Sequence, residues 1–197
     1  MTAGIRTPSD RRYSTAAMLL HWTIAALILV QIGLGYYMNE ILPDHSAAQD
    51  RIQTLHVSIG LTTLLLILVR IGVRLIFPPP PLPVELAGWE KLLAGSTHLL
   101  FYALMLALPL TGWAIVSLQH GPIGFWGLHF PRLPGLGSLA GPAHKPFRHT
   151  LTFAHTHILV YIVLANLFLH VSGALKHQFD GHPVLWRMVP FFRAPRA

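Results

Sequence analysis

The sequence contains no cysteine and carries very little charge. Because none of the 197 residues is a cysteine, the chain excludes disulfide bonds, thiolate zinc sites, cysteine-held iron–sulfur clusters and covalently attached haem. Charged residues make up 11% of the chain, against about 25% in an ordinary soluble domain. Hydrophobic residues make up 53%, which excludes a disordered chain and is untypical of a water-soluble globule.

Carboxylates are also scarce, and all of them lie outside the long apolar runs. The seven are Asp10, Glu40, Asp44, Asp50, Glu85, Glu90 and Asp180. A proton or cation pump usually needs an acidic side chain within the membrane, so this pattern argues against a pump. The net charge of +7 comes from basic residues that flank the apolar runs. It therefore indicates membrane topology rather than binding to nucleic acid.

Four apolar runs are long enough to cross a bilayer, which takes about 20 helical residues. They cover about residues 18–38, 55–77, 97–118 and 153–175. We therefore predict an all-α membrane protein, with four transmembrane helices bundled in a single domain over residues 1–197. The first run is longer than the core of a signal peptide and has no small-residue cleavage site after it, so we expect a retained helix.

The distribution of Lys and Arg predicts the orientation of the bundle. Ten of these residues lie on the side that holds both termini and four lie on the other side, so the positive-inside rule places both termini in the cytoplasm. The proline-rich segment 78–83 is expected to be extended and to lead into a short surface helix near Trp89. The connection from Gln119 to about Thr152 is expected to fold over the outer face as a cap.

Histidine is unusually frequent, with 13 residues, and several of these lie within the predicted spans. Intramembrane histidine is rare and usually functional. Sorted by depth, the histidines form two layers. The outer layer contains His56 with His155 or His157, and the inner layer contains His21, His98 and His170. The fifteen residues from His155 to His170 span about 22 Å of helix, which is enough for two stacked haem groups held by imidazoles from facing helices.

Two histidines compete for the outer position on the fourth helix. On a regular α-helix, an offset of 15 residues returns to within about 60° of the same face, whereas an offset of 13 residues leaves about 140°. Helical geometry therefore favours His155 over His157 opposite His56, and a π-bulge would absorb one extra residue. Glycines within the spans are also expected to admit a flat macrocycle or a neighbouring helix: Gly33, Gly35, Gly60, Gly72, Gly112 and Gly173.

Four motifs and the end of the chain together resemble the bacterial cytochrome b561 family, whose members are related to the cytochrome b subunits of nickel hydrogenases. The first three segments are His21–Trp22, Leu55–Gly60 and Thr97–Tyr102 with Ala107–Gly112. The others are Leu169–Val171 with Ala174–His177, and the closing segment Leu185–Pro190. The resemblance extends from about Arg12 to Pro190.

This resemblance implies a multi-pass protein of the bacterial inner membrane with two b haems. It implies that His21 and His170 ligate the cytoplasmic haem iron, and that His56 and the first histidine of the fourth helix ligate the periplasmic one. His98 is then not an axial ligand. The family ligand on the fourth helix usually precedes His170 by 14 residues, where this chain has Thr156, between His155 and His157.

The resemblance also implies electron transfer between a periplasmic donor and ubiquinone. A relative of the superoxide oxidase type oxidises superoxide and reduces quinone beside a residue matching His177 and a lysine after the second helix. Here that connection contains Glu85 and Lys91. Basic residues of the outer face are candidates for attracting an anionic donor: Arg132, Lys145 and Arg148.

Two alternative functions follow from the same residues. One is a cytochrome b anchor subunit that exchanges electrons with a partner dehydrogenase or hydrogenase. The other is a haem-free transporter that carries a metal through the histidine layers, although the lack of intramembrane carboxylates weighs against it. We expect partners among lipids, quinone and a periplasmic small anion or redox protein, and none among nucleic acids.

Overall fold

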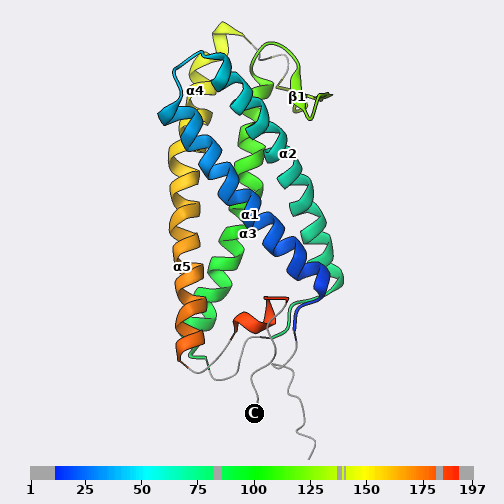
Figure 1. The fold of residues 1–197 in the computed structure, drawn as a ribbon, viewed down its shortest axis with the longest axis vertical. Helices are drawn as coiled ribbons and strands as arrows, with labels where there is room; N and C mark the ends of the chain where they lie inside the picture. The colour runs from blue at the N-terminus through cyan, green and yellow to red at the C-terminus, as the bar shows by residue number, and fades with distance from the viewer. Residues whose placement is uncertain (1–11, 82–85, 137–138, 140, 181–183, 191–197) are drawn as a thin grey trace, which may run out of the picture.

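The computed structural model describes residues 12–81, 86–136, 139, 141–180 and 184–190. Within this part of the chain, four helices are long and apolar enough to cross a membrane (Figure 1). The first three are α1 (Thr15–Tyr36), which continues into a short π-helix η2 (Tyr37–Ile41), α2 (Ala47–Ile76) and α3 (Gly88–Ser117). The fourth is built from α4 (Lys145–Phe153), the π-helix η5 (Ala154–Leu159) and α5 (Val160–Phe179). The predicted four-helix membrane fold is confirmed.

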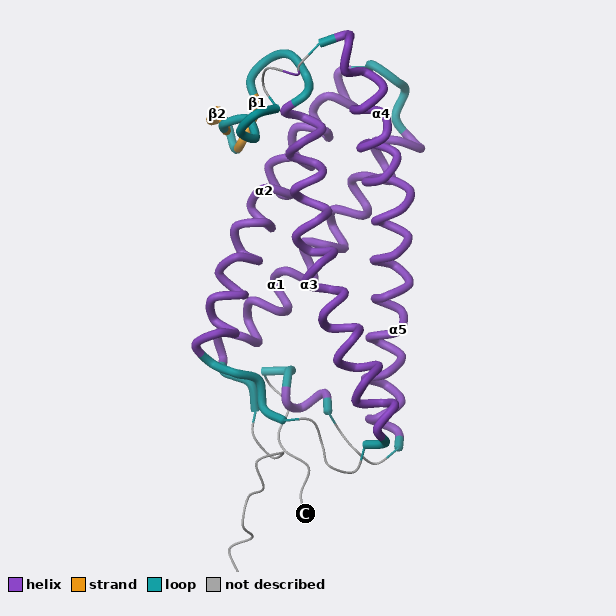
Figure 2. Tube along the Cα trace, turned by 180° about the vertical axis from the view of Figure 1, so that it is seen from behind, coloured by secondary structure: helices purple, strands orange, loops and turns teal. Residues whose placement is uncertain are grey.

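The helices run up and down, and α1 crosses obliquely over the others (Figures 1 and 2). The close contacts join α1 to α2, α2 to α3 and α3 to α5. The connections α1–α2 and α3–α4 lie at one end of the bundle, which we name the hairpin end. Residues 12–14, 77–81 and 184–190 lie at the opposite end, which we name the tail end.

The helices extend beyond the apolar runs that predicted them. Two begin at serine caps: the hydroxyl of Ser14 accepts from the N–H of Ala17 at 3.2 Å, and that of Ser46 accepts from the N–H of Gln49 at 3.1 Å. The fourth helix begins at Lys145, eight residues before the predicted start, and Pro146 lies in its first turn, where proline is tolerated. Apolar runs mark the part of a helix that lies in hydrocarbon, whereas the helix itself continues into the polar interface.

The predicted short surface helix near Trp89 is wrong, because Trp89 lies in the first turn of α3. The neighbouring Glu90 explains why the helix starts here. One carboxylate oxygen accepts from the N–H of Ala87 at 3.0 Å, and the other pairs with Lys176 of α5 at 2.8 Å. Lys176 also pairs with Asp180 at 2.7 Å. Glu90 therefore both caps α3 and ties it to α5.

The long connection before α4 contains a two-stranded hairpin, β1 (Ile123–Phe125) and β2 (Leu128–Phe130). Its turn residues Trp126 and Gly127 have φ angles of 50° and 83°, as a two-residue turn of type I′ requires. The indole N–H of Trp126 donates to Thr62 at 2.9 Å, and its backbone N–H donates to Ser58 at 3.3 Å. The hairpin is therefore held against the flank of α2 (Figure 2) rather than lying across the bundle end as a simple cap.

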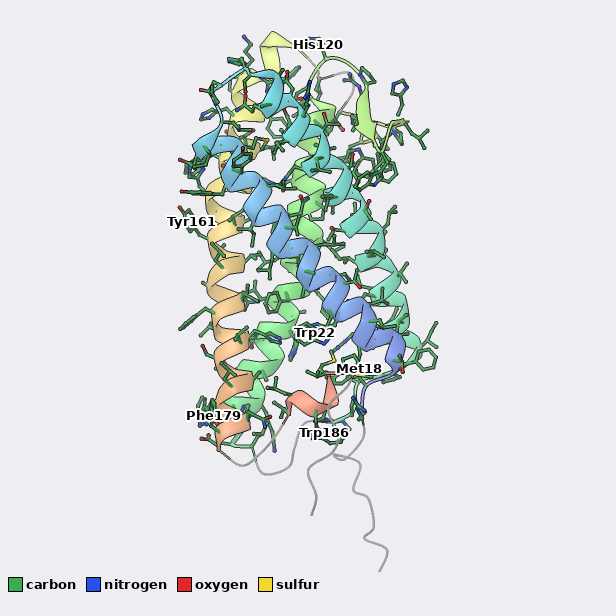
Figure 3. All side chains as sticks on the ribbon, viewed as in Figure 1. Met18, Trp22, His120, Tyr161, Phe179 and Trp186 are labelled. Carbon is green, nitrogen blue, oxygen red and sulfur yellow. The ribbon has the colours of Figure 1, made fainter. Side chains whose placement is uncertain are left out.

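The segment that contains the 3-10 helix η6 (Leu185–Arg187) is attached to the tail end of α1. Figure 3 places Met18 and Trp22 of α1 close to the segment that carries Trp186. The indole N–H of Trp22 donates to the carbonyl of Met188 at 2.9 Å, and Arg12 donates to that of Val189 at 2.6 Å. Arg187 is buried and donates to the carbonyl of Pro81 at 2.8 Å.

Large apolar side chains cover the outside of the bundle, as a lipid-facing surface requires. Phe168 and Phe179 are 71% and 83% exposed, and Tyr161 also points outward (Figure 3). Polar side chains lie between helices instead. Asn166 of α5 is buried and donates to the carbonyl of Thr97 of α3 at 3.2 Å. Gln31 of α1 donates to the carbonyl of His56 of α2 at 2.9 Å.

Gly60 is expected to be essential for this bond between α1 and α2. A Cβ atom at Gly60 would lie 2.7 Å from the Gln31 amide nitrogen, whereas one at Gly72 would meet nothing within 4 Å. Gly60→Ala should therefore displace the amide and cost about 1 kcal/mol relative to Gly72→Ala, the value of one hydrogen bond. Thermal unfolding of both variants in detergent measures the difference, and equal melting temperatures would contradict it.

Candidate functional site

The hairpin end brings together two of the predicted histidines, His56 of α2 and His155 of η5. Their ring centroids are 6.3 Å apart, and the ring planes are 77° to each other. The Nδ1 atom of His155 lies 2.9 Å from the hydroxyl of Thr111 in α3. That hydroxyl has a single proton. Its oxygen lies 2.7 Å from the carbonyl of Ala107 in the same helix, and this carbonyl accepts the proton. Thr111 therefore accepts from Nδ1–H of His155, which leaves Nε2 free as a ligand.

His56 has a buried nitrogen that lacks a hydrogen-bond partner within the described part of the chain, its Nδ1 atom. Small residues flank both rings. A Cβ atom at Gly112 would lie 3.3 Å from Cε1 of His155, and one at Gly35 would lie 3.7 Å from Cε1 of His56. Both glycines are therefore close to the imidazoles, whereas Gly60 faces Gln31 instead. A Cβ atom at the other predicted glycines meets nothing within 4 Å: Gly33, Gly72 and Gly173.

The π-helix η5 separates the two competing histidines. It covers Ala154–Leu159 and therefore contains both His155 and His157. His155 faces His56, whereas His157 is exposed and stacks on Phe153 with ring centroids 4.9 Å apart. A π-helical turn holds one more residue than an α-helical turn, so fifteen residues here rotate about as far as fourteen on a regular helix. The extra residue therefore reduces the angle between His155 and the face of His170 from about 60° to about 40°.

The tail end brings together three histidines from three helices. The ring of His170 in α5 lies 6.2 Å from that of His21 in α1 and 5.5 Å from that of His98 in α3, centroid to centroid. The Nδ1 atom of His98 donates to the carbonyl of Ala94 in its own helix at 2.7 Å. Phe101 packs edge-on against His170, with centroids 5.3 Å apart.

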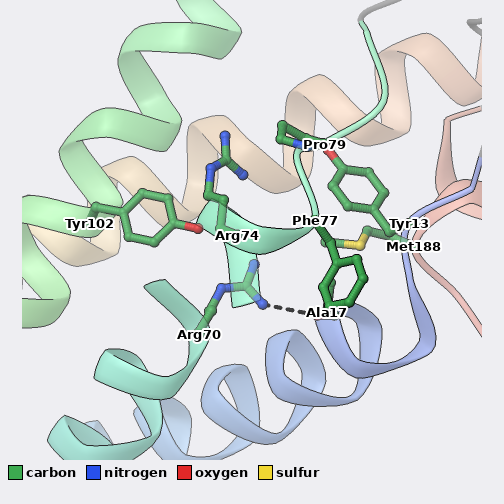
Figure 4. Close-up of a pocket in the computed structure, with 8 residues that line it drawn as sticks. All are labelled: Tyr13, Ala17, Arg70, Arg74, Phe77, Pro79, Tyr102 and Met188. Carbon is green, nitrogen blue, oxygen red and sulfur yellow. Dashed lines mark hydrogen bonds between the residues drawn. The ribbon is translucent and has the colours of Figure 1, made fainter. Parts of the chain in front are cut away.

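Arg70 of α2 lies beside the tail-end histidines. One of its guanidinium nitrogens is 3.3 Å from Nδ1 of His21, and the other donates to the carbonyl of Ala17 at 3.1 Å. Arg74, one turn further along α2, lies over the ring of Tyr102 at 5.3 Å from its centroid. Both arginines line a pocket of about 20 Å³ with Tyr13, Ala17, Phe77, Pro79, Tyr102 and Met188 (Figure 4). This volume holds about one water molecule and is too small for a quinone ring.

A larger cavity of about 260 Å³ lies at the hairpin end. Polar residues from α2 and from the connection after α3 line it, including Asp50, Gln53, Thr54, Gln119 and His120. Val57, the residue next to His56, also lines this cavity.

The remaining predicted site residues are more scattered. His177 is half-buried near the end of α5, and Glu85 lies outside the described residues. Lys176 is paired with Glu90 and Asp180. Arg132 donates to the carbonyls of Ser117 and Gly121 at 3.0 and 2.8 Å, so its side chain braces the connection before the hairpin.

The two opposed pairs have nearly equal ring separations, 6.3 Å at the hairpin end and 6.2 Å at the tail end. A zinc–imidazole bond is about 2.0–2.1 Å, so such a separation leaves room for one metal atom between the rings. Within the described ranges, no three His, Cys, Asp or Glu side chains form a group that could hold a metal ion. A metal whose remaining ligands come from a cofactor therefore suits these pairs better than a bare ion.

Comparison with known proteins identifies such a cofactor. Residues 12–191 match the family described as prokaryotic cytochrome b561. The chain belongs to the prokaryotic cytochrome b561 family. Cytochromes b561 bind b-type haem and take part in electron transfer. Together with the four apolar helices, the family membership makes the chain a multi-pass bacterial membrane protein.

Three curated relatives agree with this membership. "Cytochrome b561 homolog 2" of Escherichia coli K12 is 30% identical over 185 residues, which cover 93% of this chain and 94% of the relative. "Probable superoxide oxidase CybB" of Yersinia pestis is 26% identical over 186 residues, 91% and 97% of the two chains. "Cytochrome b562" of Cereibacter sphaeroides is 32% identical over 109 residues, 51% and 66% of the two chains.

The residues at the hairpin end fit a b haem. The orphaned nitrogen of His56, the flanking glycines and the opposed rings all suit a flat macrocycle with a metal at its centre. Sequence reasoning missed two close neighbours of these rings. Thr111 lies in one of the motifs of the family resemblance, where it has no assigned role, and Arg70 is one of the ten Lys and Arg residues counted on the side of the termini. Neither has a spacing signal, because each contact joins residues more than 40 positions apart.

Deletion of Thr156 tests the role of η5. Without this residue the π-helix should become a regular α-helix, with His155 still facing His56, so the haem absorbance per chain should be retained. Insertion of one alanine after Ile162, in the regular α5, is the matched control. It lengthens the spacing to His170 and should rotate His155 by about 100° relative to His170, which lowers the haem content. Equal haem loss in the deletion and the insertion would contradict the role assigned to η5.

Proposed function

We propose that the chain carries two b haems and passes single electrons between a periplasmic donor and ubiquinone. His56 and His155 hold the haem at the hairpin end, and His21 and His170 hold the haem at the tail end. The single observation that supports this proposal is that the same arrangement of two imidazole rings occurs at both ends of the bundle. Two opposed imidazole pairs, each from facing helices, have ring separations within 0.1 Å of one another. Each haem, when bound, supplies a one-electron carrier.

The same arrangement favours His21 over His98 as the partner of His170 at the tail end. The His21–His170 separation of 6.2 Å matches that of the other pair, whereas His98 approaches His170 edge-on at 5.5 Å. His98 instead directs its Nδ1 atom to the carbonyl of Ala94. We assign it a packing role beside the ligand. The rise from His155 to His170 is about 22 Å, which places the two carriers in opposite halves of the bilayer.

We assign the tail end of the bundle to the cytoplasm from the distribution of Lys and Arg. Ten Lys and Arg residues belong to the termini and to the α2–α3 connection with its flanks, against four on the other side. The positive-inside rule then assigns the hairpin end to the periplasm. Electrons from a periplasmic donor would therefore enter through His56 and His155 and leave through His21 and His170.

Superoxide is the donor that we favour, in line with the name of the Yersinia pestis relative. The 260 Å³ cavity does not suit an anion, because the carboxylate of Asp50 lines it. Lys145 and Arg148 offer a better approach. They lie on α4, within three turns before His155, and Lys145 is exposed. Their positive charges would steer a small anion towards the haem at this end.

Ubiquinone is proposed to bind at the tail end beside His177. This residue follows His170 by seven positions, so it lies within about 20° of the same helix face and about 10 Å further along the axis. An imidazole at this depth can hydrogen-bond a quinone carbonyl and deliver a proton from the cytoplasmic side as the quinone is reduced. Lys176, held by Glu90 and Asp180, is less suited to this role.

The haem count tests the ligand assignment. The purified chain should contain two low-spin b haems by pyridine haemochrome analysis and by reduced-minus-oxidised spectra. His155→Ala should lose one of them, because it removes an axial ligand, whereas His157→Ala should keep both. Loss of haem in His157→Ala alone would overturn the assignment, and a chain without haem would overturn the whole proposal.

Quinone reduction tests the direction and the acceptor. The isolated chain should reduce a ubiquinone analogue when superoxide is generated in the assay. His177→Ala should raise the KM for the quinone several-fold with both haems retained, and His149→Ala on α4 is the matched control. If the isolated wild-type chain contains both haems but reduces no quinone, and instead co-purifies with a larger redox subunit, the anchor-subunit alternative is correct.

A further inference from the structure

We propose that Thr111 and Arg70 bias the two haems in opposite directions, so that the haem at the tail end is the stronger electron acceptor. Both are positioning residues that act through a histidine. Thr111 lies beside His155 at the hairpin end, and Arg70 lies beside His21 at the tail end. This inference rests on the proposed function and adds a built-in direction to the electron flow.

Thr111 makes His155 a more electron-donating ligand. Its proton is committed to the backbone carbonyls of its own helix, with Ala107 at 2.7 Å and Leu108 at 2.9 Å. Its oxygen is then an acceptor for the Nδ1–H group of His155, alongside the carbonyl of Leu108. A hydrogen bond accepted from the distal nitrogen raises the basicity of an imidazole ligand. A more basic ligand stabilises the oxidised metal and lowers the midpoint potential of the haem.

Arg70 has the opposite effect on His21. A guanidinium group has donors only and is always protonated, so it cannot accept from Nδ1 and places a fixed positive charge 3.3 Å from the ring. The oxidised haem carries one more positive charge than the reduced haem. A nearby cation therefore disfavours the oxidised state and raises the midpoint potential.

Among the described residues, no carboxylate forms an ion pair with Arg70. Its second guanidinium nitrogen donates to the uncharged carbonyl of Ala17, and the ion pairs among the described residues involve Lys176, Glu90 and Asp180 instead. The half-buried position of Arg70 in an apolar helix reduces screening by water and salt. At the hairpin end, the described contacts of the two rings are with uncharged groups: the Thr111 hydroxyl, the Leu108 carbonyl, Gly35 and Gly112.

Redox titration of single variants tests the proposal. Thr111→Val should raise the midpoint potential of the hairpin-end haem, and Thr111→Ser should restore it. Arg70→Gln should lower that of the tail-end haem. We expect each change to shift the equilibrium of electron sharing between the haems about three- to tenfold, where tenfold corresponds to about 59 mV for one electron. The haem that remains in His155→Ala identifies the two transitions.

Two controls separate this effect from general damage. Thr63→Val removes a buried hydroxyl that donates to the carbonyl of Ile59 in the same way at 2.8 Å, without a hydrogen bond to a histidine among the described residues. Arg74→Gln removes a charge one turn away, over Tyr102, and should have the smaller effect. Variants that keep two haems with unchanged potentials, or with shifts of opposite sign, would overturn this inference alone. A wild-type chain without two haems would overturn the proposed function instead.

Discussion

Each imidazole inside the bundle carries two ring nitrogens, and within a bilayer neither nitrogen can turn to bulk water. The rest of the structure is arranged around this constraint. His155 uses the hydroxyl of Thr111, and His98 uses the carbonyl of Ala94. His56 keeps a buried nitrogen without a protein partner in the described part of the chain. All four membrane helices contribute such groups, so the interior of the bundle presents nitrogen ligands as well as apolar packing.

The π-helix η5 is the local solution to a conflict between sequence spacing and helix geometry. On a regular helix, His155 would point about 60° away from the line of His170, and His157 much further. The extra residue in the π-helical turn removes part of this offset, and it leaves His157 exposed against Phe153. The irregularity thus lies at the residue that needs reorientation, while α5 beyond it remains regular down to Phe179.

Much of the fold could be predicted because apolar length and charge placement are properties of contiguous sequence. The four spans and the separation of the histidines into two depths follow directly from such runs. The extra helical turns at Lys145 and Trp89 could not be predicted in this way, since polar residues beyond the hydrocarbon give no hydropathy signal. The neighbours of each imidazole could not be predicted from the sequence either. Thr111 with His155, and Arg70 with His21, meet only through the crossing of separate helices.

The attachment of residues 185–190 to α1 also has a consequence for biogenesis. Arg12 and Trp22, near the beginning of the described chain, bind the carbonyls of Val189 and Met188. Since a nascent chain emerges from its N-terminus, these carbonyls reach α1 only after all four helices have been synthesised. The tail end therefore closes last. Until then the indole of Trp22, which packs edge-on against His21, lacks the acceptor that fixes its position.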